Sequence, residues 1–109
     1  MELQAARLLL YRAAANADVL DNNVMLPGRV DTSMVKAYAA DAAFEVVNDS
    51  LQMFGARGYS KDYPLERMLR DVRMFKIAGG TSEVQKNGIA RSVFGDDERR
   101  VQLADFESE

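Results

Sequence analysis

The chain has 109 residues, 48% of them hydrophobic, so it is one domain at most. It lacks cysteine and histidine, which excludes disulfides and thiolate chemistry within the chain and predicts no metal site. No apolar run approaches the roughly 20 residues that span a bilayer, and the N-terminus lacks a signal-peptide pattern. We therefore predict a soluble protein without a membrane partner, located in the cytoplasm or, in a eukaryote, in the mitochondrial matrix.

The net charge of −3 is unevenly distributed along the chain. Residues 96–109 hold six acidic and two basic residues, a charge of −4, which leaves +1 on the rest. We therefore expect a helical domain over residues 1–95 and an acidic, frayed tail over residues 96–109, with docking to a partner as the tail's alternative role. The basic residues form no single patch, so no nucleic-acid partner is predicted.

The first expected element is a helix of about five turns between Leu3 and Leu20, because apolar and small residues recur there at alternating steps of three and four. Small residues on this stripe let a neighbouring helix approach closely. Leu8, Leu9 and Tyr11 lie off the stripe and predict a second contact face. Two contact faces would place this helix inside a bundle.

A loop is expected over residues 21–30, which contain two asparagines, a proline and a glycine. The second helix can begin at Asp31, Thr32 or Ser33, whose side chains accept hydrogen bonds from free backbone amides, and it ends near Gly55. The side chains that repeat on one side of it are Ala39, Ala43, Val46, Val47, Ser50 and Phe54. Gly55 and Gly58 then bracket a turn in which positive backbone dihedrals are cheap.

A third helix is expected from Pro64, with Asp62 as its cap and three arginines on one side. The last helix can be capped by Thr81 or Ser82, and Ser82 with Gln85 fits a capping box. Further expectations are a stop at Gly95, close packing at Gly88, ion pairs of Arg67, Arg70 and Arg73 with Glu66 and Asp71, and core filling by Tyr38, Phe44, Met53, Met68 and Met74.

Four short motifs lie between residues 51 and 91. The residues that carry them are Gln52, Gly55, Gly58 and Tyr59; Pro64, Arg67, Arg70 and Asp71; Gly80, Thr81, Glu83 and Gln85; and Ile89, Ala90 and Arg91. In this order the motifs resemble the C-terminal helical domain of acyl-CoA dehydrogenases, from Glu2 to near Gly95. Two positions depart from that family's pattern, because Ala56 replaces a glycine and Gly79 stands where the catalytic glutamate is usual.

The resemblance implies FAD as cofactor. The residues that it implies near FAD are Gln52, Met53, Phe54, Gly55 and Ala56 on the adenine side, shared with a neighbouring subunit, and Thr81, Ser82 and Glu83 beside the flavin. Gly80 and Arg91 would face the acyl-CoA substrate. By themselves, residues 79–83 suit either an anion site at a helix N-terminus or a plain connector. Residues 52–56 likewise suit a plain helix end.

Catalysis in the resembled family combines proton removal by a carboxylate with hydride transfer to the flavin. Gly79 has no side chain for this step, and the resemblance implies a base on an earlier helix, before Met1. No catalytic residue is therefore predicted in this chain. The family's N-terminal helical and middle β domains are also absent, so the chain alone is predicted to be inactive.

The sequence thus predicts an all-α, up-and-down helical bundle that lacks its first helix. We interpret it as a C-terminal fragment or short subunit of an FAD-dependent acyl-CoA dehydrogenase-like oxidoreductase. The open groove would be covered by a homo-oligomer, a dimer or tetramer, or by missing domains. Two alternatives stay open: a non-catalytic helical assembly module, and a relative with other flavin chemistry such as an acyl-CoA oxidase or nitroalkane oxidase.

Overall fold

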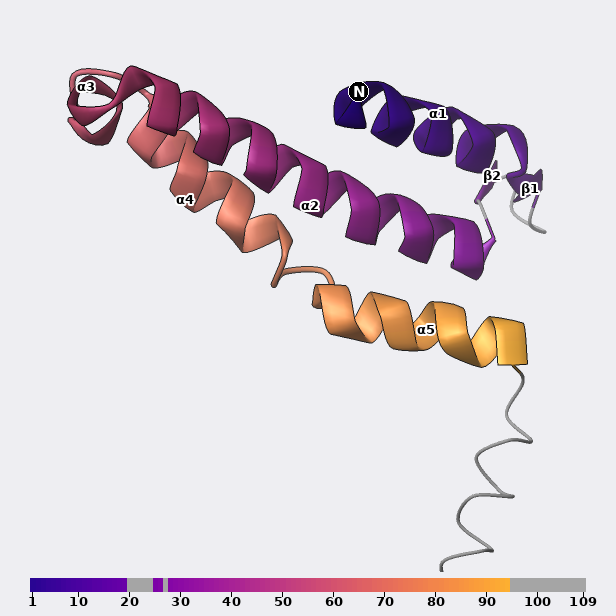
Figure 1. The fold of residues 1–109 in the computed structure, drawn as a ribbon. Helices are drawn as coiled ribbons and strands as arrows, with labels where there is room; N and C mark the ends of the chain where they lie inside the picture. Colours follow the sequence, from indigo (N-terminus) through magenta and orange to yellow (C-terminus); the bar gives the residue numbers. More distant parts are fainter. Residues whose placement is uncertain (20–24, 27, 95–109) are drawn as a thin grey trace, which may run out of the picture.

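The computed structural model describes residues 1–19, 25–26 and 28–94 (Figure 1). The elements are α1 (Glu2–Ala15), β1 (Asp18–Val19), β2 (Met25–Leu26), α2 (Arg29–Phe54), α3 (Ala56–Tyr59), α4 (Leu65–Phe75) and α5 (Ser82–Phe94). The predicted all-α class is confirmed, because the only extended structure in the described residues is one antiparallel ladder of two residue pairs, β1 with β2. The predicted tail and the predicted stop at Gly95 lie outside the described residues.

The long helix α2 is the centre of the fold (Figure 1). It has 26 residues and is therefore about 39 Å long. Helix α1 packs along its N-terminal half, while α4 and α5 follow one another along α2, with α5 beside the N-terminal half. All three run antiparallel to α2. No described helix is long and apolar enough to cross a membrane.

The buried residues are small. Among the described residues the buried hydrophobic side chains are Ala13, Ala37, Ala40 and Ala42, and the buried polar ones are Ser33 and Ser82. Small side chains on α2 let three helices approach its backbone closely from different sides. No large side chain in the described part of the chain is fully buried. The described helices are thus held by close packing, without a core of large apolar residues among them.

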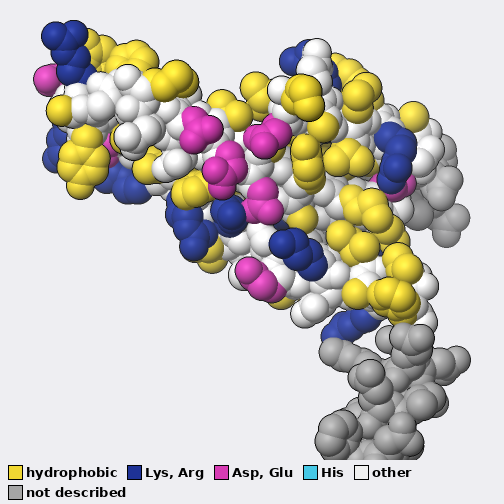
Figure 2. Space-filling model, viewed as in Figure 1, with side chains coloured by type: hydrophobic (Ala, Val, Ile, Leu, Met, Phe, Trp, Pro, Cys, Tyr) yellow, Lys and Arg dark blue, Asp and Glu magenta, His cyan; other side chains and the backbone are white. Residues whose placement is uncertain are grey.

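Large apolar side chains lie on the surface instead, and Figure 2 shows hydrophobic groups spread over much of one face. Met53 is 81% exposed, and Tyr38, Met68 and Met74 are also exposed, so the prediction that they fill the core is wrong for this chain. The second contact face of α1 is open too, with Leu8 67% exposed. Periodicity indicates which face avoids water but not which chain covers it.

Helix α2 begins at Arg29, two to four residues earlier than predicted. Its N-cap is Gly28, not Asp31, Thr32 or Ser33. Thr32 Oγ1 donates to the Gly28 carbonyl at 3.0 Å, and Ser33 is buried. These polar side chains therefore already lie within the helix.

Asp31 joins the end of α1 to the start of α2. Arg12 Nη2 donates to Asp31 Oδ1 at 2.8 Å, and Asn16 Nδ2 donates to Asp31 Oδ2 at 3.3 Å. The Arg12 hydrogen bond, followed by that of Asn16, lowers the pKa of the Asp31 carboxyl. Both charges suit the dipoles of their helices, because Arg12 lies in the last turn of α1 and Asp31 in the first turn of α2. Helix α1 ends at Ala15, short of the five turns predicted.

Candidate functional site

The connector between α4 and α5 passes through two glycines in the left-handed region, Gly79 with φ 67° and Gly80 with φ 89°. A Cβ at Gly79 would meet no atom within 4 Å, whereas one at Gly80 would lie 2.6 Å from Gln85 Nε2. Position 79 therefore has room for a side chain, such as the glutamate usual in the resembled family. Its backbone would still disfavour that side chain by about 1–2 kcal/mol.

Two side chains from different helices hold this connector. Lys36 of α2 donates through Nζ to the Gly80 carbonyl. Gln85 of α5 donates through Nε2 to the Gly79 carbonyl at 3.0 Å. Two consecutive carbonyl groups are therefore held, one by a residue 44 positions before it and the other by a residue six positions after it.

The end of α4 is anchored beside the connector. Lys76 Nζ lies 2.8 Å from Asp41 Oδ1 of α2 and 5.2 Å from the centre of the Phe44 ring. An ammonium over an aromatic face gains a favourable cation–π interaction. The Ser82 backbone N–H donates to the Lys76 carbonyl at 3.2 Å, which closes the connector into a compact loop.

Thr81 caps α5. Its Oγ1 accepts a hydrogen bond from the Val84 backbone N–H at 3.3 Å, so of the two predicted caps the structure selects Thr81. The predicted capping box of Ser82 with Gln85 is wrong, because Gln85 reaches back to Gly79 and Ser82 is buried. With Thr81 as the N-cap, the capping-box position three residues later is Val84, and Gln85 lies one residue beyond it.

Glu83 remains on the surface in the first turn of α5. Its own backbone N–H, and next the Thr81 hydroxyl, donate to the carboxylate and lower the pKa of Glu83. The carboxylate is therefore favoured over the neutral acid, as expected for an acidic group at a helix N-terminus.

The corner between α2 and α3 lies at the far end of α4. Helix α2 ends at Gly55 as predicted, with φ 58°, and the Gly55 N–H donates to the carbonyls of Leu51 and Gln52, each at 3.1 Å. Gly58 does not use the positive φ that glycine makes cheap in this turn. A Cβ on Gly58 would lie 2.8 Å from Phe54 Cβ and 2.9 Å from the Leu51 carbonyl oxygen, so close packing demands this glycine.

The predicted adenine-side residues form an open surface at this corner. Gln52, Met53 and Phe54 are exposed, and Ala56 begins α3 in ordinary helical backbone. The rings of Phe54 and Tyr63 pack edge to face with centroids 5.5 Å apart. The glycine-to-alanine departure at position 56 is thus compatible with the local backbone.

The arginines of α4 point to water. Arg70 Nη2 pairs with Glu66 Oε2 at 3.0 Å across one helical turn, as predicted, and the Arg70 side chain is 70% exposed. Arg67, Arg73 and Asp71 are exposed, and none of them has an ion pair within the described residues.

The structure does not bring all predicted site residues together. The two segments predicted near FAD, residues 52–56 and 81–83, lie at opposite ends of α4, a helix of 11 residues and about 16 Å. Arg91 is exposed and about 14 Å along α5 from the start of that helix, so it is not beside Gly80. Within the described residues no cluster of three or more carboxylates, histidines or cysteines is placed to hold a metal.

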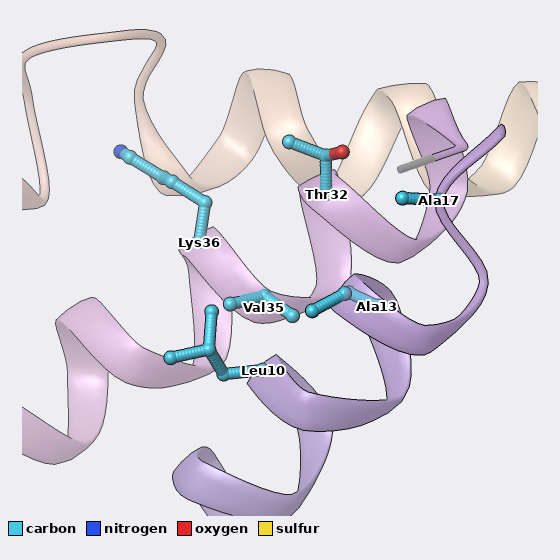
Figure 3. A pocket seen from close by; sticks show the side chains of 7 residues that line it. Leu10, Ala13, Ala17, Thr32, Val35 and Lys36 are labelled. Atoms are coloured by element: carbon cyan, nitrogen blue, oxygen red, sulfur yellow. The ribbon is translucent and has the colours of Figure 1, made fainter. Parts of the chain in front are cut away.

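Lys36 is a residue of this site that no sequence motif indicated. It lies on an apolar stripe of α2, beside a groove of about 540 Å³ between α1 and α2 (Figure 3). The residues that line this groove are Leu10, Ala13, Ala14, Ala17, Thr32, Val35 and Lys36. One sequence signal could have indicated it. Lys36 is a charged residue among apolar neighbours on this part of the helix, namely Val35, Ala39, Ala40 and Ala43.

The sequence model of the family described as "Acyl-CoA dehydrogenase, C-terminal domain" matches residues 1–94. A 3-sulfinopropanoyl-CoA desulfinase from Paraburkholderia xenovorans is 41% identical over 95 residues, and a cyclohexane-1-carbonyl-CoA dehydrogenase from Geobacter metallireducens is 42% identical over 92 residues. These alignments cover 87% and 84% of this chain and 23% of each relative.

The fold is also similar to a solved structure of butyryl-CoA dehydrogenase from Megasphaera elsdenii. The TM-score is 0.75, the sequence identity is 35%, and the match covers 86% of this chain and 23% of that one. The chain therefore spans about a quarter of the length of the relatives it matches.

Proposed function

Because the chain belongs to the acyl-CoA dehydrogenase family, we propose that it is part of an FAD-dependent oxidoreductase that acts on CoA thioesters. In such an enzyme it would supply flavin-facing and subunit-facing surface rather than the reacting groups. The observation that carries this proposal is its open apolar surface. In the described part of the chain only alanines, serines and Gly58 are buried, while large side chains such as Leu8, Met53 and Phe94 are exposed.

Exposed apolar faces of this extent favour completion by other protein surface. Each fully buried large side chain contributes about 1.5–3 kcal/mol, and the described residues gain little from that source. The proposed occupants are the other domains of the same enzyme and further copies of it in a dimer or tetramer.

Two exposed surfaces have the chemical character that a flavin cofactor needs. At the α2–α3 corner, Met53 and Phe54 offer apolar surface to a planar ring, and at the α4–α5 connector the glycines let a ligand approach the main chain closely. Bound FAD would supply a hydride acceptor. Because the two surfaces lie at opposite ends of α4, we propose that they belong to two flavin sites, the corner completing a site held mainly by a neighbouring subunit.

Residues near the connector would contact either the flavin or the CoA thioester. We propose that Thr81, Glu83 and the main chain of the buried Ser82 face the flavin and that Gly80 and Arg91 face the CoA thioester, with Arg91 at a distant part of that long substrate. Gly79 has no side chain to remove a proton, and the base would come from outside this chain. The chain by itself is therefore proposed to be inactive.

A second candidate is a non-catalytic helical assembly module derived from the same family. Gly79 favours it, because a carboxylate is absent where the family's glutamate is usual. The reaction also has an alternative: one relative is named a desulfinase and another a dehydrogenase, and both names specify a CoA thioester. We propose α,β-dehydrogenation as the leading reaction.

FAD titration by calorimetry, with light scattering on the same sample, tests the proposal. The natural protein is expected to bind FAD in the micromolar range as an oligomer. Met53→Gln should weaken binding about tenfold, and Met74→Gln, an equally conservative change at an exposed methionine of α4, should leave it unchanged. A folded protein that binds no FAD would refute the flavoenzyme and favour the assembly module.

A further inference from the structure

The α4–α5 connector should be among the most flexible backbone in the chain. Gly79 and Gly80 are consecutive and both have positive φ. Glycine adopts this region readily, but it adopts many other backbone conformations as readily. Ordering one residue costs about 1–2 kcal/mol of conformational entropy, and glycine has the most to lose. A fixed connector therefore needs contacts that hold it.

Lys36 provides one such contact from α2. Its alkyl stem lines the apolar groove beside Val35, and Figure 3 shows the side chain extending away from Leu10 and Val35. The ammonium group donates to the Gly80 carbonyl, and within the described residues it has no carboxylate partner. A hydrogen bond from a charged donor is stronger than one between neutral groups.

Holding the Gly80 carbonyl also orients the next amide. In a trans peptide the C=O of Gly80 and the N–H of Thr81 lie in one plane and point in opposite directions, and the described chain has no cis bond. Lys36 thus directs the Thr81 N–H away from α2. Gln85, through the Gly79 carbonyl, orients the Gly80 N–H in the same way.

We propose that Lys36 is a positioning residue, which fixes the main chain of Gly80 and Thr81 at the flavin-facing connector. This inference rests on the proposed function for the connector's role, while the anchoring itself rests on contacts within the chain. A merely structural tie between α2 and the connector is already present in the Lys76–Asp41 pair, one turn of α2 further on. Lys36 differs because it contacts the glycine backbone itself.

The test uses the intact natural protein with Lys36→Met, which keeps the stem in the groove and removes the donor. Lys36→Arg restores a charged donor, and Lys61→Met, at an exposed lysine near the start of α4, is the matched control. Hydrogen exchange is followed at the amide of Ser82, which donates across the connector to the Lys76 carbonyl, and at the amide of Val84, which donates to the Thr81 cap. The visible absorption spectrum of bound flavin is the second readout.

Lys36→Met is expected to speed exchange at Ser82 and Val84 about tenfold and to shift the flavin spectrum. Lys36→Arg, which keeps a charged donor, should have the exchange rates and the flavin spectrum of the parent, and so should Lys61→Met. Unchanged exchange at the two amides would overturn the proposal, and so would a uniform increase over α2 and α5. If the parent protein binds no FAD, the proposed function fails, and the exchange data still decide whether Lys36 holds the connector.

Amine acetylation of the parent protein decides the question if Lys36→Met fails to fold. Lys36 should react about tenfold more slowly than Lys61, because its ammonium is engaged with the Gly80 carbonyl. Equal reactivity of the two lysines would overturn the proposal.

Discussion

The same substitution, glycine to alanine, is expected to have opposite effects at Gly58 and Gly88. Both glycines lie in helices, and neither has a positive φ. At Gly58 the new methyl group would lie 2.8 Å from Phe54 Cβ and 2.9 Å from the Leu51 carbonyl oxygen. At Gly88 the nearest atom would be Ser33 Oγ at 3.6 Å, an ordinary contact.

The magnitudes follow from these contacts. Alanine in place of a helical glycine gains about 0.5–1 kcal/mol through lower backbone entropy. Overpacking costs about 1–3 kcal/mol, and at Gly58 one clashing atom belongs to the backbone and cannot rotate away. We therefore expect Gly58→Ala to lower the free energy of unfolding by about 1–2 kcal/mol and Gly88→Ala to raise it by about 0.5–1 kcal/mol.

Urea unfolding followed by far-UV circular dichroism measures both changes. The protein concentration must be the same for all variants, because self-association adds to apparent stability. The reasoning would be refuted if Gly58→Ala were as stable as the parent, or if Gly88→Ala were as damaging as Gly58→Ala. If the slope of the unfolding free energy against urea concentration is the same as in the parent, both variants expose the same surface on unfolding.

Two further predictions concern charged pairs. The Asp31 pKa is lowered from its ordinary 3.8 by Arg12 and Asn16, so this carboxylate stabilises the fold fully above that value and loses its effect as pH falls through the lower folded pKa. Asp31→Asn should remove that part of the acid dependence of the urea midpoint, and an unchanged acid limb would contradict it. Arg70→Ala should cost only about 0.3–0.5 kcal/mol because its pair with Glu66 is exposed. A loss above about 2 kcal/mol in the same assay would instead indicate a cofactor-linked network for Arg70.

Local signals predicted most of the helical framework. The period of apolar residues indicates the first two long helices, while Pro64 and the candidate caps Thr81 and Ser82 indicate the last two. The end of α2 at Gly55 follows from the need for positive φ at a helix stop. The predicted start of α2 is wrong. The sequence offers Asp31 as a helix cap, but in the fold its carboxylate accepts hydrogen bonds from Arg12 and Asn16 of another segment. Asp62 likewise caps nothing, since α4 begins from Pro64.

The candidate site divides in the same way. The order of glycines and arginines between residues 51 and 91 identifies the family, because spacing along the chain is written in the sequence. The contact of Lys36 with Gly80 is not, since the two residues are 44 positions apart and meet only when α5 packs on α2. The same packing puts the two proposed flavin surfaces at opposite ends of α4.

By itself, the sequence determined that helices form and that α2 stops at Gly55, because periodicity and glycine dihedrals act within a few residues. Only the tertiary structure decided which glycine is needed for its backbone and which for close approach, as Gly55 and Gly58 illustrate. It also decided that the apolar faces of α1 and α4 remain open. Burial depends on what lies opposite a face, and a pattern along one chain carries no information about that partner.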